Sequence, residues 1–380
     1  MPKKGNYRNL GFRAPSLRRA LTYSARAPSR ESGSEFIPSR HVRSLASSQT
    51  KGSILLTPMK AALLLALLSF SLSAADQPKV AHRFAIDRTV KPAMDELIAA
   101  DAKVEILATG FTWSEGPVWF QNKLIFSDVP NNTAFAWRPG AQGEEVFLKP
   151  SGTSEPSGRQ GSNGLAVDLK GNLLLCQHGD RCVAQLLPDK KFKKLATNFE
   201  GSRFNSPNDL CVAKDGAIYF TDPPYGLGDE TAELDFHGIF KLSPDGSVSL
   251  VSKEVKWPNG IALSLDQKTL YIAISDPNDT RIAACDLNGA HLRDIFKASS
   301  LKGANRPGNC DGLKLDEKGN IWATGPGGVL ILSPEGKHLG TIMTGQPTAN
   351  LAWGADGHTL FITSNKNLLS IQTKVKGAGF

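Results

Sequence analysis

Pro207-Asn208-Asp209-Leu210-Cys211-Val212 opens a short unit that the sequence repeats six times. Each copy begins with an acid or an amide and continues through a small residue, an apolar alternation, a tight turn and a second apolar run. The residues that begin the copies, called lead residues below, lie between 39 and 52 positions apart and are Glu115, Asn163, Asn208, Asn259, Asp311 and Asn350. A period of roughly 40–50 residues with strands in every unit predicts a β-propeller.

The turns inside the units support antiparallel hairpins. Asp215-Gly216 and Lys170-Gly171-Asn172 supply the positive φ angles that short hairpin turns need. A second hairpin follows in most units, so one unit makes one four-stranded blade. The last unit ends one strand short, and Val104–Ala108 stands unassigned before the first. We therefore predict an all-β, six-bladed propeller over residues 101–380, whose ring is closed by this N-terminal strand and so has no open sheet edge.

The positive charge of the chain lies outside the repeats. The formal net charge is +8, but residues 1–75 hold 12 Lys and Arg against 2 Asp and Glu. Residues 76–380 are left with 32 basic and 34 acidic residues. The basic isoelectric point is thus no argument for nucleic acid as a partner.

An apolar run, Ala61–Leu72, follows Met59-Lys60 and precedes Ser73-Ala74-Ala75. It is shorter than the about 20 residues that a membrane span needs, and it fits a signal peptide with a small-residue cleavage site. We expect a signal peptide at 59–75, an N-terminal arm at 76–100 with a short helix near Met94–Ile98, and export to the periplasm or the cell exterior without a stable membrane span. Residues 1–58 are then a non-native or disordered basic extension, with a genuine targeting segment as the alternative.

The cysteines give no metal signature. There are five, and neither a CxxC pair nor a Cys/His ligand spacing occurs. Cys176 and Cys182 could pair across a hairpin in an exported protein. Buried free thiols are the simpler interpretation.

Radial symmetry should bring the lead residues together on the propeller axis. All six offer oxygen atoms, and such hard donors suit Ca²⁺ or Mg²⁺. Glu115 and Asp311 together match the charge of a divalent ion. Asn and Asp before a strand are also common turn formers, but turn chemistry does not explain Glu115.

Five motifs in order resemble the SMP-30/gluconolactonase family, in particular its bacterial gluconolactonase branch, over about Gly110 to Ile371. They are Ser114–Trp119, Asn205–Asp209, Thr221–Gly226, Pro258–Ala262 and Asp311-Gly312. The resemblance implies one catalytic divalent metal in the central channel of a six-bladed propeller, and hydrolysis of sugar lactones. It implies the metal ligands Glu115, Asn208, Asn259 and Asp311, and the substrate-binding residues Asn163, His178 and Asn208. Some relatives have an Arg close before the amide that matches Asn208; here the nearest, Arg203, is five residues upstream.

Lactone hydrolysis needs a polarised carbonyl group and an activated water. A bound cation can supply the first and a carboxylate the second; we assign the general base to Asp311. Ca²⁺ is the first candidate, with Zn²⁺, Mg²⁺ and Mn²⁺ as the others. The loop of Asp222 and Tyr225 could line the mouth of the channel or form a rigid turn.

Other functions remain open at this point. The enzyme could hydrolyse another lactone or a phosphotriester, the propeller could bind a ligand without catalysis, or it could be a quinone-dependent sugar dehydrogenase. No G-x-S-x-G nucleophile elbow, Walker sequence or G-x-G-x-x-G is present.

Overall fold

A computed structural model of the chain describes residues 84–153 and 160–380. The chain divides into the units Met1–Ala75 and Asp76–Phe380, and every described residue belongs to the second. The predicted extension and signal peptide lie outside the described residues. Within the described ranges, no helix has the length and apolarity that a bilayer span requires.

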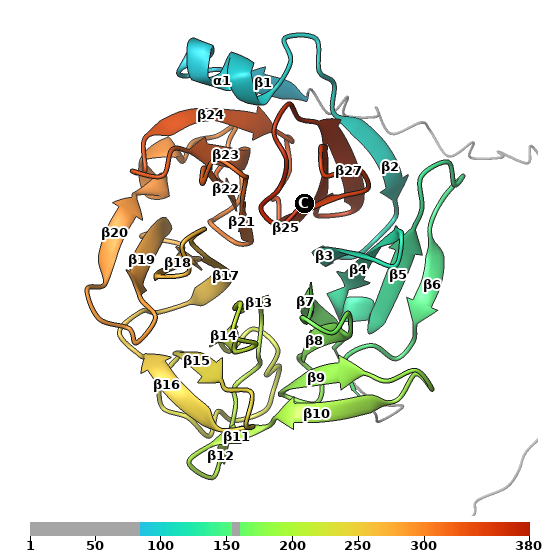
Figure 1. The fold of residues 1–380 in the computed structure, drawn as a ribbon, viewed down its shortest axis with the longest axis vertical. Coiled ribbons are helices and arrows are strands. Elements are labelled where there is room, and N and C mark those ends of the chain that lie inside the picture. Colours follow the sequence, from blue (N-terminus) through green and yellow to red (C-terminus); the bar gives the residue numbers. More distant parts are fainter. Residues whose placement is uncertain (1–83, 154–159) are drawn as a thin grey trace, which may run out of the picture. The chain divides into compact units, whose positions relative to one another are not determined.

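Six antiparallel sheets stand around a central axis as the blades of a propeller, which confirms the predicted fold (Figure 1). From the axis outward, the first three blades are β3 (Ser114–Phe120), β4 (Lys123–Asp128), β5 (Thr133–Trp137) and β6 (Glu145–Leu148); β7 (Ser162–Val167), β8 (Leu173–Gln177), β9 (Cys182–Leu186) and β10 (Phe192–Ala196); and β13 (Leu210–Val212), β14 (Ile218–Asp222), β15 (Gly238–Leu242) and β16 (Val248–Ser252). The next two are β17 (Pro258–Leu263), β18 (Thr269–Ile274), β19 (Arg281–Asp286) and β20 (Arg293–Phe296); and β21 (Leu313–Leu315), β22 (Ile321–Gly325), β23 (Gly328–Leu332) and β24 (His338–Met343).

The sixth blade joins the two ends of the repeat region. It consists of β25 (Asn350–Gly354), β26 (Thr359–Ser364), β27 (Asn367–Gln372) and β2 (Glu105–Thr109). β2 runs antiparallel to β27, with Glu105 opposite Ser370. The predicted closure of the ring by an N-terminal strand is therefore confirmed.

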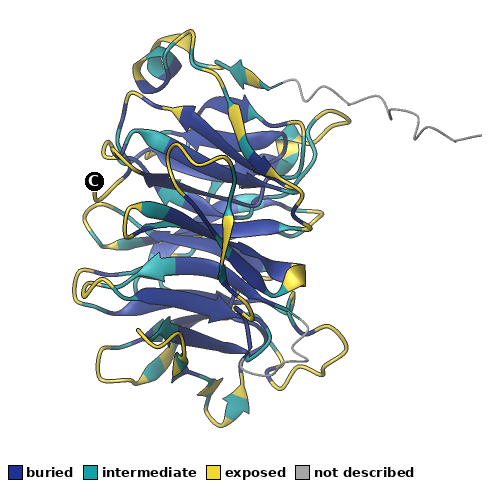
Figure 2. Cartoon of the chain, turned by 90° about the vertical axis from the view of Figure 1, so that its right-hand side faces the viewer, coloured by how far each residue is buried: buried dark blue, intermediate teal, exposed yellow. Residues whose placement is uncertain are grey.

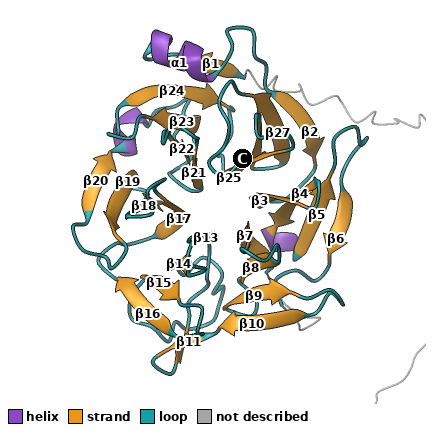
Figure 3. Ribbon diagram, in the orientation of Figure 1, coloured by secondary structure: helices purple, strands orange, loops and turns teal. Residues whose placement is uncertain are grey.

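Short elements lie around the ring, and among the described residues helical structure is limited to three brief segments, drawn in purple in Figure 3. β1 (Ala85–Asp87) adds an unpredicted fifth strand to β24. The helix α1 (Lys91–Leu97), expected from the sequence, buries Met94 and Leu97. The other elements are the 3-10 turns η1 (Val129–Asn131) and η2 (Ala298–Leu301) and the small hairpin of β11 (Asn198–Phe199) and β12 (Ser202–Arg203).

The hydrophobic core lies between neighbouring blades. Buried residues fill the strands, whereas exposed residues gather at turns and loops (Figure 2). Between the third and fourth blades, Tyr219 and Ile239 pack with Ile261 and Ile272 in one cluster. Each such side chain contributes about 1.5–3 kcal/mol when fully buried, so each blade is stabilised by its neighbours.

All five cysteines are free thiols. Cys176 and Cys182 are buried in adjacent strands without forming a bridge. The interpretation of buried free thiols is confirmed for these two.

The innermost strands approach one another closely at the axis, which explains the glycine after several lead residues. A Cβ on Gly116 would lie 2.0 Å from the carbonyl oxygen of Asn163, and one on Gly260 would lie 2.3 Å from that of Asp311. Gly260 N instead donates to this Asp311 oxygen at 2.8 Å. Glycine at these positions therefore lets the inner strands pack closely, so that the lead residues before them lie near one another on the axis.

Candidate active site

A cavity of about 580 Å³ opens at the end of the axis where the inner strands begin. All of the predicted metal-binding and substrate-binding residues line it: Glu115, Asn163, His178, Asn208, Asn259 and Asp311. They come from five blades, so the closure of the ring assembles a site that no single blade contains. Asn350, the sixth lead residue, does not line the cavity and contacts Glu115 instead.

Hydroxyl groups on the second strand of a blade, counted from the axis, hold the backbone of two lead residues in place. Ser127 Oγ donates to the carbonyl oxygen of Asn163 at 3.0 Å, and Thr221 Oγ1 donates to that of Asn259 at 2.7 Å. In both cases the hydroxyl belongs to the preceding blade. These contacts fix the backbone of the lead residues across the blade boundary, so their side chains are preorganised.

Two acidic side chains line the cavity in surroundings that disfavour their ionised forms. Glu115 is only 2% exposed, and its Oε2 accepts hydrogen bonds from Gly116 N at 2.7 Å and Asn350 Nδ2 at 3.2 Å. Burial, with a smaller contribution from the charge of Asp209, raises the pKa of Glu115 to about 7. Burial and the charge of Glu115 raise the pKa of Asp311 well above its ordinary value. Buried like charges of this kind require a compensating cation or a proton.

The oxygen atoms of the cavity suit a hard cation as ligands. The Oδ1 atoms of Asn163, Asn208 and Asp311 are buried and have no hydrogen-bond partner. Buried acceptors normally find a partner, because leaving one unpaired costs about 1–3 kcal/mol. Within the described ranges, no three His, Cys, Asp or Glu side chains gather as ligands, so this donor set is two carboxylates supplemented by amides. Oxygen ligands of this kind favour a hard cation such as Ca²⁺ over softer metal ions.

His178 presents a hydrogen-bond acceptor to the cavity. It is 2% exposed, and its Nδ1 lies 3.1 Å from Gln160 Oε1. Because the amide oxygen can only accept, we assign the proton to Nδ1. Nε2 is buried without a partner, and burial lowers the pKa of His178 to about 4. The ring is therefore neutral at pH 7 and offers a lone pair.

Aromatic rings form one wall of the cavity. Tyr225 stacks on Trp257 with ring centroids 5.6 Å apart at 25°. Asp222 anchors the loop of Tyr225, because it accepts hydrogen bonds from the backbone N–H groups of Asn205 and Ser206, both at 2.7 Å. The two alternatives for this loop are thus both realised, since Asp222 holds a rigid turn and Tyr225 lines the mouth.

Arg203 does not line the cavity. Its guanidinium group lies 3.7 Å from Glu230 and 4.0 Å from Glu233. A role of Arg203 in substrate binding finds no support in this position.

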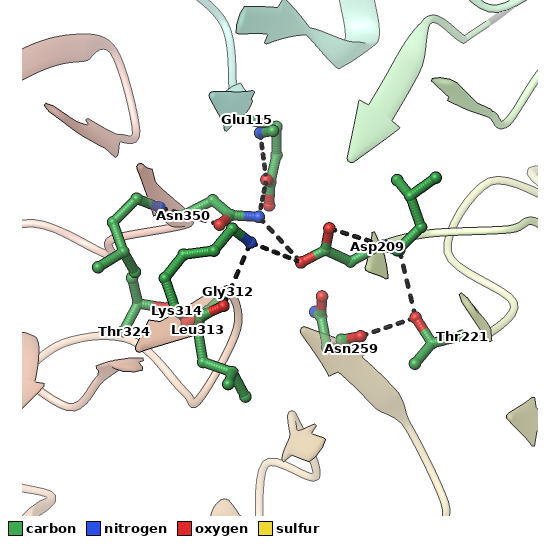
Figure 4. A network of polar contacts seen from close by, with 12 residues as sticks. Glu115, Asp209, Thr221, Asn259, Gly312, Leu313, Lys314, Thr324 and Asn350 are labelled. Carbon is green, nitrogen blue, oxygen red and sulfur yellow. Dashed lines mark hydrogen bonds and ion pairs between the residues drawn. The ribbon is translucent and has the colours of Figure 1, made fainter. Parts of the chain in front are cut away.

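The sequence analysis missed a polar cluster behind the cavity (Figure 4). Asp209 is 1% exposed, and its Oδ2 lies 3.4 Å from Asn350 Nδ2 and 3.8 Å from Lys314 Nζ. A signal for Asp209 was present, because four of the six units have glycine directly after the lead residue and this unit has an acid. Other lining residues without an earlier assignment are Gln160, Trp113, Trp257 and Ser275.

Fold and site together define a six-bladed propeller with a cavity lined by carboxylate and amide oxygen atoms at one end of its axis. The family model described as the SMP-30/gluconolactonase/LRE-like region matches residues 113–366. The chain belongs to this family, as the five motifs indicated.

Known relatives agree with this assignment. The gluconolactonase of Zymomonas mobilis is 39% identical over 307 residues, which cover 75% of this chain and 85% of the relative. The structure of a gluconolactonase from Xanthomonas campestris has a TM-score of 0.68 at 31% identity, covering 77% of this chain and 96% of that one. A calcium-binding protein, regucalcin, from Agrobacterium tumefaciens shares the fold, with a TM-score of 0.57 at 17% identity over 73% of this chain and 95% of that one.

Proposed function

We propose that this chain hydrolyses a sugar lactone of the gluconolactone type, using a divalent cation bound in the axial cavity. Family membership and the gluconolactonase relatives support a lactone-hydrolysing enzyme. The observation that carries the cation is the convergence of the Glu115 and Asp311 carboxyl groups, one with an unpaired Oδ1, with the unpaired amide oxygens of Asn163 and Asn208 in one cavity.

Glu115, Asn208, Asn259 and Asp311 would hold the cation. The oxygen-rich set favours Ca²⁺, with Zn²⁺, Mg²⁺ and Mn²⁺ as alternatives. When bound, such an ion supplies Lewis-acid polarisation of the lactone carbonyl. The unpaired Oδ1 of Asn208 can serve the ion or a substrate hydroxyl.

Asp311 takes the proton from the attacking water. The water oxygen bonds to the carbonyl carbon, the ring C–O bond breaks, and the ring oxygen leaves as a hydroxyl group after receiving the proton from Asp311. The carboxylic acid that forms then releases its own proton to solvent. In the metal-free site, burial and the Glu115 carboxylate raise the pKa of Asp311. A bound cation favours the ionised form of the carboxylate, which is the form that accepts a proton from water.

Asn163, His178 and the aromatic wall orient the sugar. His178 Nε2 and Asn163 Oδ1 are unpaired acceptors, so each can accept a hydrogen bond from a ring hydroxyl. The stacked rings of Tyr225 and Trp257 offer an apolar surface for the C–H face of the same ring. Acceptors and aromatic rings in the same cavity match a polyhydroxylated lactone better than a purely apolar one.

The test is proton release from D-glucono-δ-lactone with and without chelator, for the wild type, Asp311→Ala and a control, Asp276→Asn. Asp276 neighbours the lining residue Ser275 but does not line the cavity itself. We expect chelator and Asp311→Ala to abolish activity and Asp276→Asn to keep it. Chelator-insensitive hydrolysis or an active Asp311→Ala would refute the mechanism. If a phosphotriester or a non-sugar lactone is turned over faster than D-glucono-δ-lactone in the same assay, the substrate belongs to that class instead.

We further propose export to the periplasm or cell exterior, on the basis of the apolar run Ala61–Leu72 and the small residues that follow it. N-terminal sequencing of the native protein should read Asp76-Gln77-Pro78. A native chain that retains the apolar run would contradict export by cleavage.

A further inference from the structure

Three acidic side chains and one ammonium group share the axis. Glu115 and Asp311 line the cavity, and Asp209 lies directly behind them. Asn350 Nδ2 joins two of the three, because it donates to Glu115 Oε2 at 3.2 Å and to Asp209 Oδ2 at 3.4 Å. Lys314 Nζ lies 3.8 Å from the same Asp209 oxygen. With all groups ionised, this axial cluster of Glu115, Asp209, Asp311 and Lys314 has two net negative charges.

The side chain of Asp209 lies in the space that Gly164 of the neighbouring blade leaves open because it has no Cβ. Its Oδ1 accepts a hydrogen bond from Leu210 N at 2.8 Å. A Cβ on Gly164 of the neighbouring blade would lie 2.5 Å from this Oδ1. The carboxylate is therefore packed between two blades and almost fully buried, and Lys314 lies beside it as a counter-charge.

Lys314 reaches this carboxylate from the opposite end of the axis. It lines a second cavity, formed by the far ends of the inner strands, and does not line the first. Its side chain is 28% exposed, and Nζ also donates to Leu313 O at 3.2 Å. The ammonium group is thus a fixed counter-charge that leaves the mouth of the first cavity free for an ion.

We propose that Lys314, through Asp209, sets the charge preference of the cation site, so that a divalent ion balances the axial cluster. The inference rests on the proposed cation in the first cavity. Without the ammonium group the cluster has three negative charges. The affinity for a trivalent ion then increases more than the affinity for a divalent ion. Removal of the ammonium group strengthens the attraction of a trivalent ion by one unit-charge interaction more than that of a divalent ion. In a partly buried site, this changes the ratio of the two affinities about tenfold.

Terbium(III) binding measures this preference without relying on catalysis. Trp113 and Trp257 line the cavity and can sensitise bound Tb³⁺, and Ca²⁺ competition then gives the ratio of the two affinities. We expect Lys314→Met to shift the ratio about tenfold toward Tb³⁺. Lys214→Met is the matched control, because Lys214 lines the same second cavity and has no contact with Asp209 among the described ion pairs; its ratio should stay at the wild-type value.

Two further variants complete a charge cycle. Asp209→Asn should shift the ratio toward Ca²⁺, and the double variant Asp209→Asn with Lys314→Met should return it to near the wild-type value, because the net charge is restored. Circular dichroism on each variant confirms folding, and Lys314→Gln replaces Lys314→Met if the latter misfolds.

The outcomes separate this inference from the proposed function. A wild type that binds both ions, with equal ratios in Lys314→Met and the wild type, overturns the role of Lys314 and leaves the lactonase intact. A double variant that keeps the shift of Lys314→Met also overturns it, since the effect would not pass through Asp209. A wild type that binds neither ion overturns the cation site and this inference together.

Discussion

The two ends of the propeller axis have cavities of equal size that are lined by different kinds of side chain. Each has a volume of about 580 Å³. One is lined by five of the lead residues at the beginnings of the inner strands, and the other by residues two or three positions after a lead residue, such as Leu165, Ile261 and Trp353. Size therefore does not distinguish them. The buried, unpaired oxygen atoms of Asn163, Asn208 and Asp311 lie only at the first.

This contrast follows from one strand serving two purposes. In β3, Glu115 faces the first cavity and Val118 the second. The start of the strand contributes polar groups that cost stability when unpaired, while its end contributes apolar packing that stabilises the ring. Substitutions at the two ends should consequently affect different properties.

The largest effect should come from removing charge at the first cavity. Glu115→Gln keeps the size of the side chain but removes one of the two lining carboxylates, so we expect lactone hydrolysis to fall about 10⁴-fold, equivalent to about 5 kcal/mol. Steady-state kinetics with saturating Ca²⁺ measures this. Val118→Ala, on the same strand but at the second cavity, is the matched control and should change kcat/KM less than about twofold. Comparable losses in both variants would remove the distinction between the two ends.

The second cavity should show the reverse behaviour. Trp353 is 4% exposed, and its ring meets Trp322 edge-on with centroids 5.2 Å apart. Trp353→Ala should lower the free energy of unfolding by about 4 kcal/mol, measured by urea denaturation, while kcat/KM of the folded enzyme stays within about twofold. An unstable variant that also loses activity under fully folding conditions would show that the second cavity contributes to catalysis.

The fold was predictable because the repeat recurs on a regular spacing and its last unit is incomplete. The missing strand of the sixth blade could be supplied only by the unassigned strand before the first unit, now β2. β1 was missed because Ala85–Asp87 is too short for a periodic pattern and becomes a strand only by pairing with β24. The hairpin of β11 and β12, with two residues in each strand, was missed for the same reason.

The site was predictable where symmetry alone placed it. The lead residues could be assigned to the axis from their register in the repeat, whereas His178 lies outside that register and came from the family resemblance. Lys314 was missed because a lysine between two leucines in a strand usually faces solvent. Its partner Asp209 is distant in sequence, so only the closed ring brings the two charges together.

Ionisation at the first cavity should make the metal-free protein sensitive to pH. Burial raises the pKa of Glu115 from 4.5 to about 7. Below pH 4.5 the group is protonated in both the folded and the unfolded chain; as the pH rises to 7, the unfolded chain ionises first and the folded state loses relative stability. In chelator, the free energy of unfolding should therefore fall by about 3 kcal/mol over this interval.

Denaturation at several pH values tests this expectation, with Glu115→Gln as the control that lacks the group. Saturating Ca²⁺ should oppose the loss in the wild type, because the cation compensates the carboxylates. Equal pH dependence of the wild type and Glu115→Gln in chelator would show that Glu115 is not the responsible group.

A smaller effect is expected at the neutral histidine. His178→Phe removes the Nε2 acceptor while keeping an aromatic ring, and we expect KM for gluconolactone to rise about tenfold, which is about 1.4 kcal/mol, with kcat nearly unchanged. Because burial lowers the pKa of His178 to about 4, wild type and variant should share the same pH profile of kcat between pH 5.5 and 8. A change in that profile would indicate proton transfer by His178 rather than hydroxyl binding.

The smallest effect should come from the aromatic wall. The hydroxyl of Tyr225 lies beside the side chains of Ser275 and Asn259, while its ring stacks on Trp257. Tyr225→Phe keeps the stack and removes one polar contact to a lead residue, so kcat/KM should fall about threefold to tenfold, or about 1 kcal/mol. Tyr225→Ala removes the stack as well and should raise KM further, since the sugar then loses part of its apolar surface. If Tyr225→Phe is as impaired as Tyr225→Ala, the hydroxyl and not the ring is the important group, and the first cavity orients its substrate by polar contacts alone.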